Sequence, residues 1–250
     1  MTIILAPAKK MRVDTDSFAV RGLPRFLDRT ETLLATLRAM PPDELQKLWK
    51  CNDSIAVLNV ERLADMDLRR NLTPALFSYE GIAYQYMAPG VFTDQQLEYV
   101  AAHLRILSGF YGVLRPFDGV TPYRLEMGAK LAVGDSRDLY EFWGSALAES
   151  LCAESKLIIN LASKEYSQVV EKHLPSDAHF LTVVFGEHAG GKTVEKGTLC
   201  KMARGEMVRY MAENQIERPE QMRDFDRLGY RFCAGESDEN TYTFIKDTDT

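Results

Sequence analysis

A short apolar run opens the chain and stops at Pro7, and this feature limits what the chain can fold into. Residues 2–6 are too few for a stable helix but are suited to a strand that is buried on both faces. The runs 157–161 and 180–185 also predict strands, and weaker patterns indicate further strands at 75–79, 193–199, 230–233 and 241–245. Strands separated by long helical stretches predict a mixed sheet with helices packed around it.

The stretches between these runs are helical in pattern. Residues 24–67 are rich in Leu, Glu, Arg and Ala, and they predict two or three helices that break near Pro41 and at 52–54. Further helices are predicted at 94–107, 138–153 and 201–214. No linker divides the chain. We therefore predict one compact domain over residues 1–250, with a mixed β-sheet core flanked by helices and a helical section at about 24–107.

The helix at 94–107 has the clearest signals. Thr93 is a suitable N-cap, and Gln96 stands where a capping box needs it. Leu97 begins an apolar stripe, and Arg105 lies at the edge of that stripe, where its stem can pack on the core and its charged head can reach solvent. The pattern predicts a surface helix with a cation near its end.

Composition excludes several classes of protein. Apolar residues make up 46% of the chain and charged residues 26%, which is typical of a globular protein. No apolar run approaches the roughly 18 residues of a membrane span, so we expect no membrane partner. The four cysteines are scattered without a C-x-x-C pair, which favours free thiols in a reducing compartment. We expect a cytoplasmic protein.

The sequence also contains a P-loop pattern that its context argues against. Residues 186–193 match G-x-x-x-x-G-K-[ST] after a predicted strand, but β-branched residues and Gly197 follow instead of a helix. Glycines between two strand-like runs favour a hairpin turn. The four histidines have no metal-ligand spacing, and no serine lies in a nucleophile elbow. We therefore predict no catalytic residue, no metal and no cofactor.

The distribution of charge is more informative than the net charge of −6. Residues 1–12 contain three cations and no acid, residues 103–130 contain four Arg or Lys and two acids, and residues 199–210 contain three cations and one acid. If folding brings these segments together, an anionic protein has a positive cleft. Otherwise they are three separate solvated faces.

Residues 104–128 suggest a phosphate-binding turn. A helix that ends near Gly109, a short turn with Gly112 and a second short helix would form an αα-hairpin over 97–115. Backbone N–H groups in such a turn, together with Arg105 and Arg115, suit a phosphate. The alternative is a glycine-capped connection whose arginines pair with acids, for which the candidates are Asp118 and Glu126.

Four motifs in this order resemble those of the YaaA family, a bacterial peroxide-stress resistance family. They are Ala6-Pro-Ala-Lys9, the string from Leu107 to Gly128, Asn160-Leu-Ala-Ser-x-Glu-Tyr166 and Lys201-x-Ala-Arg-Gly-x-Met207. The resemblance extends from residue 3 to about 233. It implies an α+β fold with a positive cleft and a helix-hairpin-helix element, DNA binding without sequence preference, and protection during peroxide stress. The family has no established catalytic activity, so the resemblance does not imply a reaction.

This sequence departs from the family pattern at three places. Ala6 replaces a serine, Lys10 replaces a threonine, and the glycines Gly109 and Gly112 are three residues apart, whereas ordinary helix-hairpin-helix turns space them by two. The first two changes leave the basic character intact. The third means that a phosphate-binding turn at this place has an atypical form.

The leading hypothesis is therefore a DNA-binding protein of the peroxide response, which binds duplex or branched DNA electrostatically and has DNA-repair proteins as further partners. The residues that we predict to contact DNA are Lys9, Arg105, Gly109, Gly112, Arg115, Arg124, Lys201 and Arg204.

A competing hypothesis is an enzyme that acts on a small phosphorylated or nucleotide substrate. It rests on the polar set in the family motifs, which consists of Glu126, Asn160, Ser163, Glu165 and Tyr166. The same set would otherwise be a buried hydrogen-bond network. Deep placement of Glu126 and Glu165 beside the arginines would favour the enzyme, and a long open groove would favour DNA.

Overall fold

The computed structural model describes residues 1–247 and contains an eight-stranded mixed sheet. Seven of its strands lie in the order β11-β12-β9-β8-β1-β5-β6, and β10 pairs with β9. Neighbouring strands from β5 to β12 run parallel, whereas β6 and β11 are antiparallel at the edges. The strands are β1 (Thr2–Leu5), β5 (Leu104–Ser108), β6 (Gly112–Leu114), β8 (Leu157–Asn160), β9 (His179–Ala189), β10 (Lys192–Val194), β11 (Tyr230–Phe232) and β12 (Thr241–Lys246). The predicted mixed sheet flanked by helices is confirmed.

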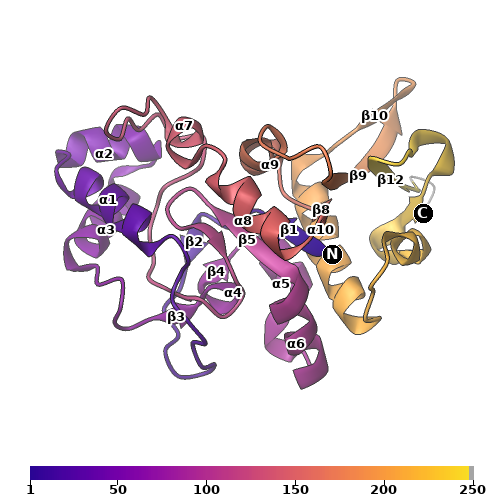
Figure 1. Ribbon diagram of the computed structural model, residues 1–250, viewed down its shortest axis with the longest axis horizontal. Helices are drawn as coiled ribbons and strands as arrows, with labels where there is room; N and C mark the ends of the chain where they lie inside the picture. The colour runs from indigo at the N-terminus through magenta and orange to yellow at the C-terminus, as the bar shows by residue number, and fades with distance from the viewer. Residues whose placement is uncertain (248–250) are drawn as a thin grey trace.

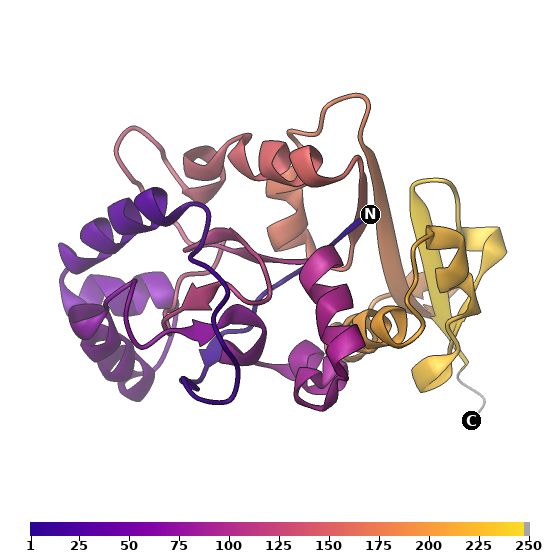
Figure 2. The same ribbon diagram turned by 60° about the horizontal axis from the view of Figure 1, so that its bottom comes forward.

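The predicted helical section at 24–107 contains all the helices of the first half of the chain. Residues 24–67 form three helices, as expected, and these lie at one end of the molecule, opposite β11 and β12 (Figures 1 and 2). The helices of this half are α1 (Leu27–Arg38), α2 (Pro42–Trp49), α3 (Asp53–Asp65), α4 (Ala75–Ser78), α5 (Ile82–Met87), η1 (Pro89–Val91) and α6 (Asp94–His103). Two short antiparallel strand pairs also lie in the first half of the chain. In one, β2 (Lys10–Met11) pairs with β4 (Tyr79–Glu80), and in the other, β3 (Thr73–Pro74) pairs with β7 (Gly119–Val120).

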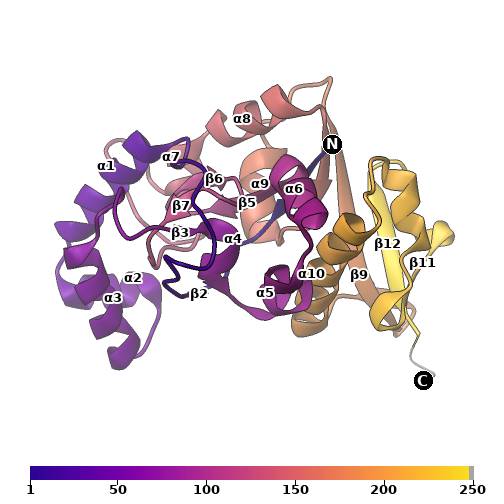
Figure 3. The same ribbon diagram turned by 90° about the horizontal axis from the view of Figure 1, so that it is seen from below.

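The second half alternates helices with the remaining strands. The helix predicted over 138–153 is divided at Gly144, whose φ of 50° lies in the left-handed region. The elements are α7 (Leu139–Trp143), α8 (Ala146–Glu154), α9 (Lys164–Glu171), α10 (Gly197–Glu213), η2 (Pro219–Asp224), η3 (Arg227–Gly229) and η4 (Ala234–Glu236). Figure 3 shows α8 on one side of β1 and α5 with α10 on the other. Among residues 1–247, no helix is both long enough and apolar enough to cross a membrane.

Two predicted strands are wrong in whole or in part. Residues 75–78 form the helical turn α4, which is buried on every side, so its apolar run carries no periodicity that distinguishes helix from strand. Residues 193–199 form a strand only up to Val194, and α10 begins at Gly197. The hairpin that was favoured over a P-loop is confirmed, because β10 pairs with β9 and Gly190 and Gly191 have φ values of 59° and 76°.

The helix-hairpin-helix element expected over 97–115 is not confirmed. The capping box at Thr93 is present, but α6 ends at His103 instead of 107. The next residues form β5, which is buried at every position, pairs in parallel with β1 and turns back into β6 as a β-hairpin. Pairing with the central strand prevails over the local helical pattern. The Ser108 hydroxyl closes the turn by accepting hydrogen bonds from the N–H groups of Phe110 and Tyr111.

The topology creates a crevice beside the central strand. After β1 the chain crosses to β5 on one side, and after β8 it crosses to β9 on the other side. The loops that leave the carboxyl ends of β1 and β8 therefore diverge. In open α/β sheets, ligands bind at such switch points.

Candidate phosphate-binding site

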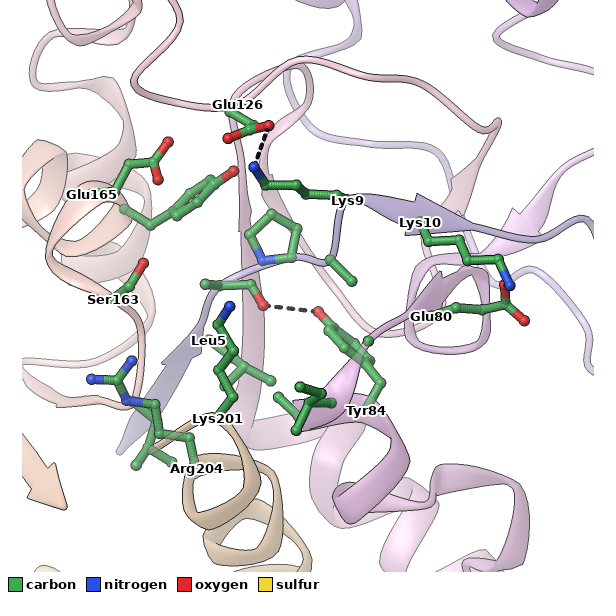
Figure 4. A pocket seen from close by; sticks show the side chains of 18 of the residues that line it. Leu5, Lys9, Lys10, Glu80, Tyr84, Glu126, Ser163, Glu165, Lys201 and Arg204 are labelled. Carbon is green, nitrogen blue, oxygen red and sulfur yellow. Dashed lines mark hydrogen bonds and ion pairs between the residues drawn. The ribbon is translucent and has the colours of Figure 1, made fainter. Parts of the chain in front are cut away.

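A cavity of about 370 Å³ occupies this crevice (Figure 4). The residues that follow β1 form its floor, and the residues that follow β8 form one wall. The segment 123–126, the first turn of α5 and the side chains of Lys201 and Arg204 on α10 complete the lining. Each of the three basic segments of the sequence contributes to this cavity.

Four of the six predicted DNA-contacting cations line the cavity, namely Lys9, Arg124, Lys201 and Arg204. With Lys10, the lining has five cationic side chains against the three carboxylates of Glu80, Glu126 and Glu165, which leaves a net charge of +2. The whole protein has a net charge of −6. The cavity is thus a local positive site on an anionic molecule.

Arg105 and Arg115 lie outside this lining. The Arg105 side chain is only 8% exposed, and its Nη2 atom lies 2.7 Å from a carboxylate oxygen of Glu154. Arg115 is exposed and lies 3.4 Å from the other oxygen of the same carboxylate. Arg105 therefore neutralises a partly buried acid. Glu154 lies at the end of α8, far from Arg105 along the chain, so no local pattern connects the two residues.

The sequence suggested that arginines of residues 104–128 pair with Asp118 and Glu126, and the structure shows this pairing only in part. Asp118 accepts a hydrogen bond of 2.8 Å from the backbone N–H of Arg115, not from its side chain. Burial raises the pKa of Asp118 to about 6. Glu126 pairs with Lys9, whose Nζ lies 2.9 Å from a carboxylate oxygen, and Arg124 lies 3.8 Å from the same oxygen.

Gly109 and Gly112 also lie outside the lining, and both are needed for close packing. A Cβ atom at Gly109 would lie 2.7 Å from the carbonyl oxygen of Leu125, so this glycine allows the β5–β6 turn to pack on the segment that includes Glu126. Gly112 has a φ of 78° and packs against the Trp143 ring. Gly109 thus supports the cavity wall from behind, whereas Gly112 serves the packing around Trp143.

Two carboxylates of the competing hypothesis line the cavity. The Oε1 atom of Glu165 accepts a hydrogen bond of 2.9 Å from the N–H of Gly128, which holds this carboxylate beside the segment that contains Glu126. Ser163 and Tyr166 lie on the same wall. The acids therefore stand beside the cations, which is the arrangement that favours a small-substrate site.

Asn160 has a structural role. It is 4% exposed and does not line the cavity. Its side-chain oxygen accepts a hydrogen bond of 2.9 Å from the N–H of Ala162 and so fixes the turn between β8 and α9. For this residue the hydrogen-bond network is the better interpretation.

Three tyrosines that line the cavity are largely buried, namely Tyr84, Tyr123 and Tyr166. Burial raises the pKa of each above its usual value, so all three remain protonated at neutral pH. The hydroxyl of Tyr84 donates to the carbonyl of Ala6 at 3.2 Å, which fixes the floor of the cavity. Sequence reasoning missed Tyr84 and Tyr123, because nothing in the local pattern distinguishes them from core tyrosines.

The close approach of α10 to α5 determines where Lys201 and Arg204 lie (Figure 3). A Cβ atom at Gly205 would lie 1.9 Å from the carbonyl oxygen of Ala83, so only glycine allows this contact. Ala203 and Met207 are buried on the same helix. The string Lys201-x-Ala-Arg-Gly-x-Met207 thus encodes both the packing of the helix and its two cations.

Both arginines of the cavity have unused hydrogen-bonding capacity. The Nε atoms of Arg124 and Arg204 are buried and have no hydrogen-bond partner among residues 1–247. Arg204 donates to Glu195 at 3.1 Å, and Arg124 makes one long bond of 3.4 Å to the carbonyl of Trp49. Largely buried guanidinium groups with an unpartnered buried Nε–H favour an additional anion.

The described part of the chain contains no group of three His, Cys, Asp or Glu residues that could hold a metal ion. The polar groups that line the cavity are ammonium, guanidinium, carboxylate, hydroxyl and backbone groups. These groups can bind an anion, and the two carboxylates can accept protons.

Comparison with known proteins identifies the relatives of this chain. The family model described as "Peroxide stress protein YaaA" matches residues 1–236. A UPF0246 protein of Agathobacter rectalis is 56% identical over 98% of this chain and 98% of its own length. UPF0246 proteins of Lachnoclostridium phytofermentans and Pediococcus pentosaceus are 51% and 49% identical, each over 98% of this chain and over 96% and 98% of their own lengths.

Proposed function

The chain belongs to the peroxide stress protein YaaA family, and on this premise we propose that it binds DNA in the peroxide-stress response. The observation that supports this function is the convergence of cations from three distant segments on one cavity of an anionic protein. Such a local positive site attracts a polyanion despite the net charge. Binding takes place in the cytoplasm, and DNA-repair proteins are its expected partners.

The proposed contacts are electrostatic and independent of base sequence. Lys9, Arg124, Lys201 and Arg204 neutralise phosphates and release their counterions. If all four take part, the logarithm of the binding constant falls with the logarithm of salt concentration with a slope of about −3.6, since each contact contributes about −0.9. Arg105 is bound to Glu154 and contributes nothing to this slope.

Fluorescence anisotropy with labelled mixed-sequence duplexes over a range of salt concentrations tests this function. We expect similar affinities for unrelated sequences and a slope that becomes about 0.9 less steep in the Lys201→Gln variant. Arg115→Gln removes an exposed cation outside the cavity and serves as the matched control. Absence of duplex binding at low salt, or equal slopes for Lys201→Gln and wild type, would contradict the proposal.

The position of Glu126 and Glu165 favours a second function, an enzyme that acts on a small phosphorylated or nucleotide substrate. Two carboxylates beside four cations supply the bases and the anion-binding groups that such a reaction needs. Phosphorus and proton NMR of nucleotides incubated with the protein tests this function. Turnover that is lost in Glu165→Gln would support an enzyme, and unchanged substrates would leave binding as the function.

A further inference from the structure

We propose that the cavity accepts a nucleoside phosphomonoester, specifically the terminal phosphate and the attached nucleotide at a DNA strand end or nick. This inference rests on the proposed DNA binding and names the part of DNA that enters the site. A free mononucleotide presents the same chemistry, so the experiment below separates the two sources.

The size of the cavity is the first argument. Its volume of about 370 Å³ lies near the lower end of the range for small-molecule pockets, roughly 300 to 1,000 Å³. The major groove of a duplex alone is about 12 Å wide, so the backbone of an intact duplex can lie only across the mouth of the cavity, with its phosphates facing the cations, and the duplex cannot enter the cavity itself. One nucleotide with its phosphate is an object of suitable size.

The charge of the cavity is the second argument. A phosphomonoester carries about −1.5 to −2 at neutral pH, whereas an internal phosphodiester carries −1. The net charge of +2 in the lining matches a terminal phosphate. Lys201 is exposed and has no acidic partner among residues 1–247, so its charge is available to a ligand.

The arrangement of the side chains is the third argument. Lys201 and Arg204 point from α10 toward the side of the cavity where Ser163 lies (Figure 4). The unpartnered Nε of Arg204 belongs to the same group of donors. Apolar and aromatic side chains form the rest of this region, including those of Ile82 and Tyr84. A phosphate fits beside the cations, and a sugar and base fit against the apolar wall.

The test compares nicked duplexes of one sequence, whose nick carries a 5′-phosphate, a 3′-phosphate or only hydroxyl groups, at a fixed salt concentration. We expect at least one phosphorylated nick to bind about tenfold more tightly than the hydroxyl nick. The Lys201→Gln variant should lose this preference. The control variant Lys172→Gln removes an exposed cation at the C-terminal end of α9, and it should keep the preference for phosphorylated nicks. A second arm measures competition by a deoxynucleoside monophosphate and by the matching deoxynucleoside.

The outcomes separate this inference from the proposed function. Equal affinity for phosphorylated and hydroxyl nicks, with duplex binding intact, overturns the inference and leaves DNA binding in place. Binding of the mononucleotide by wild type but not by Lys201→Gln, without binding of any duplex, overturns the proposed function and identifies free nucleotides as the source of the phosphomonoester. If no probe binds, both are wrong.

Discussion

The contact between α5 and α10 determines where Lys201 and Arg204 lie, and Gly205→Ala tests it. The added Cβ would lie 1.9 Å from the carbonyl oxygen of Ala83, more than 1 Å inside the closest approach that real Cβ atoms show. The obstructing atoms belong to the backbone, so one helix must move. Overpacking of this kind costs typically 1–3 kcal/mol and occasionally more.

The helical propensity of alanine opposes this cost. Replacing glycine by alanine inside a helix gains up to about 1 kcal/mol. The overlap is with backbone atoms, so the cost lies at the upper end of this range, about 3 kcal/mol, and the net expectation is a loss of about 2 kcal/mol in the free energy of unfolding. This loss lowers the melting temperature by about 4–8 °C in a chain of this length. Either movement changes the distance between Lys201 on α10 and the α5 side of the cavity, so DNA binding measured well below the melting temperature should weaken.

Urea unfolding followed by circular dichroism measures the stability change. Gly197→Ala is the matched control, because Gly197 lies in the same helix and its Cβ would meet no atom within 4 Å. The control should equal or exceed the wild type in stability. A Gly205→Ala variant that is as stable as the wild type would refute the packing argument.

Three further predictions concern buried groups away from the cavity. Glu154→Gln should lower the free energy of unfolding by about 2 kcal/mol, because it leaves the buried Arg105 guanidinium without its counter-charge. The variant should not change the salt dependence of DNA binding, and unchanged stability in urea would contradict the role of this ion pair. Burial raises the pKa of Asp118 to about 6, so the folded protein binds a proton at this carboxylate more tightly than the unfolded chain does. The stabilisation that comes from protonating Asp118 is lost as the pH rises through 6. Between pH 5 and 7 the wild type should therefore lose about 1 kcal/mol relative to Asp118→Asn in urea unfolding, and a constant difference would show that the carboxylate is not desolvated. Burial raises the pKa of the Cys200 thiol to about 11. Mass spectrometry after mild peroxide treatment should therefore find Cys200 unmodified while the more exposed Cys51 reacts, and early oxidation of Cys200 would contradict its burial.

The central part of the fold could be predicted from short sequence patterns. Within the predicted run 2–6, residues 2–5 form a buried strand because the apolar residues are too few for a helix, and the strand ends just before Pro7. The capping box at Thr93 is a local signal and was also found correctly. Patterns of this kind depend only on neighbours along the chain, and they are therefore visible in the sequence.

The errors arose where distant contacts decide the local structure. Residues 104–108 follow a helix without a break in pattern, but pairing with β1 makes them a strand. Residues 75–78 are buried on all sides, which removes the periodicity that separates helix from strand. The partner of Arg105 is Glu154, which lies 49 positions away, and no spacing rule connects such a pair.

The site was predicted in part for the same reason. The sequence identified the three basic segments, and the family motifs included Glu126, Glu165 and Lys201. It did not reveal that only Lys9, Arg124, Lys201 and Arg204 share a cavity, since this depends on how the loops after β1 and β8 diverge. The sequence also did not reveal that Tyr84 and Tyr123 line the cavity, because a tyrosine beside a pocket has the same sequence pattern as a tyrosine in the core.

The central claim is that segments distant in the sequence form one DNA-binding site at the carboxyl ends of β1 and β8. Amide chemical shifts of the labelled protein, recorded with and without a mixed-sequence duplex, test it most directly. We predict that the shift changes concentrate in the segments 6–10, 123–126, 163–166 and 201–204, each of which contributes side chains to the cavity lining. Changes concentrated instead at the β5–β6 hairpin or on the outer faces of α1–α3 would contradict the claim.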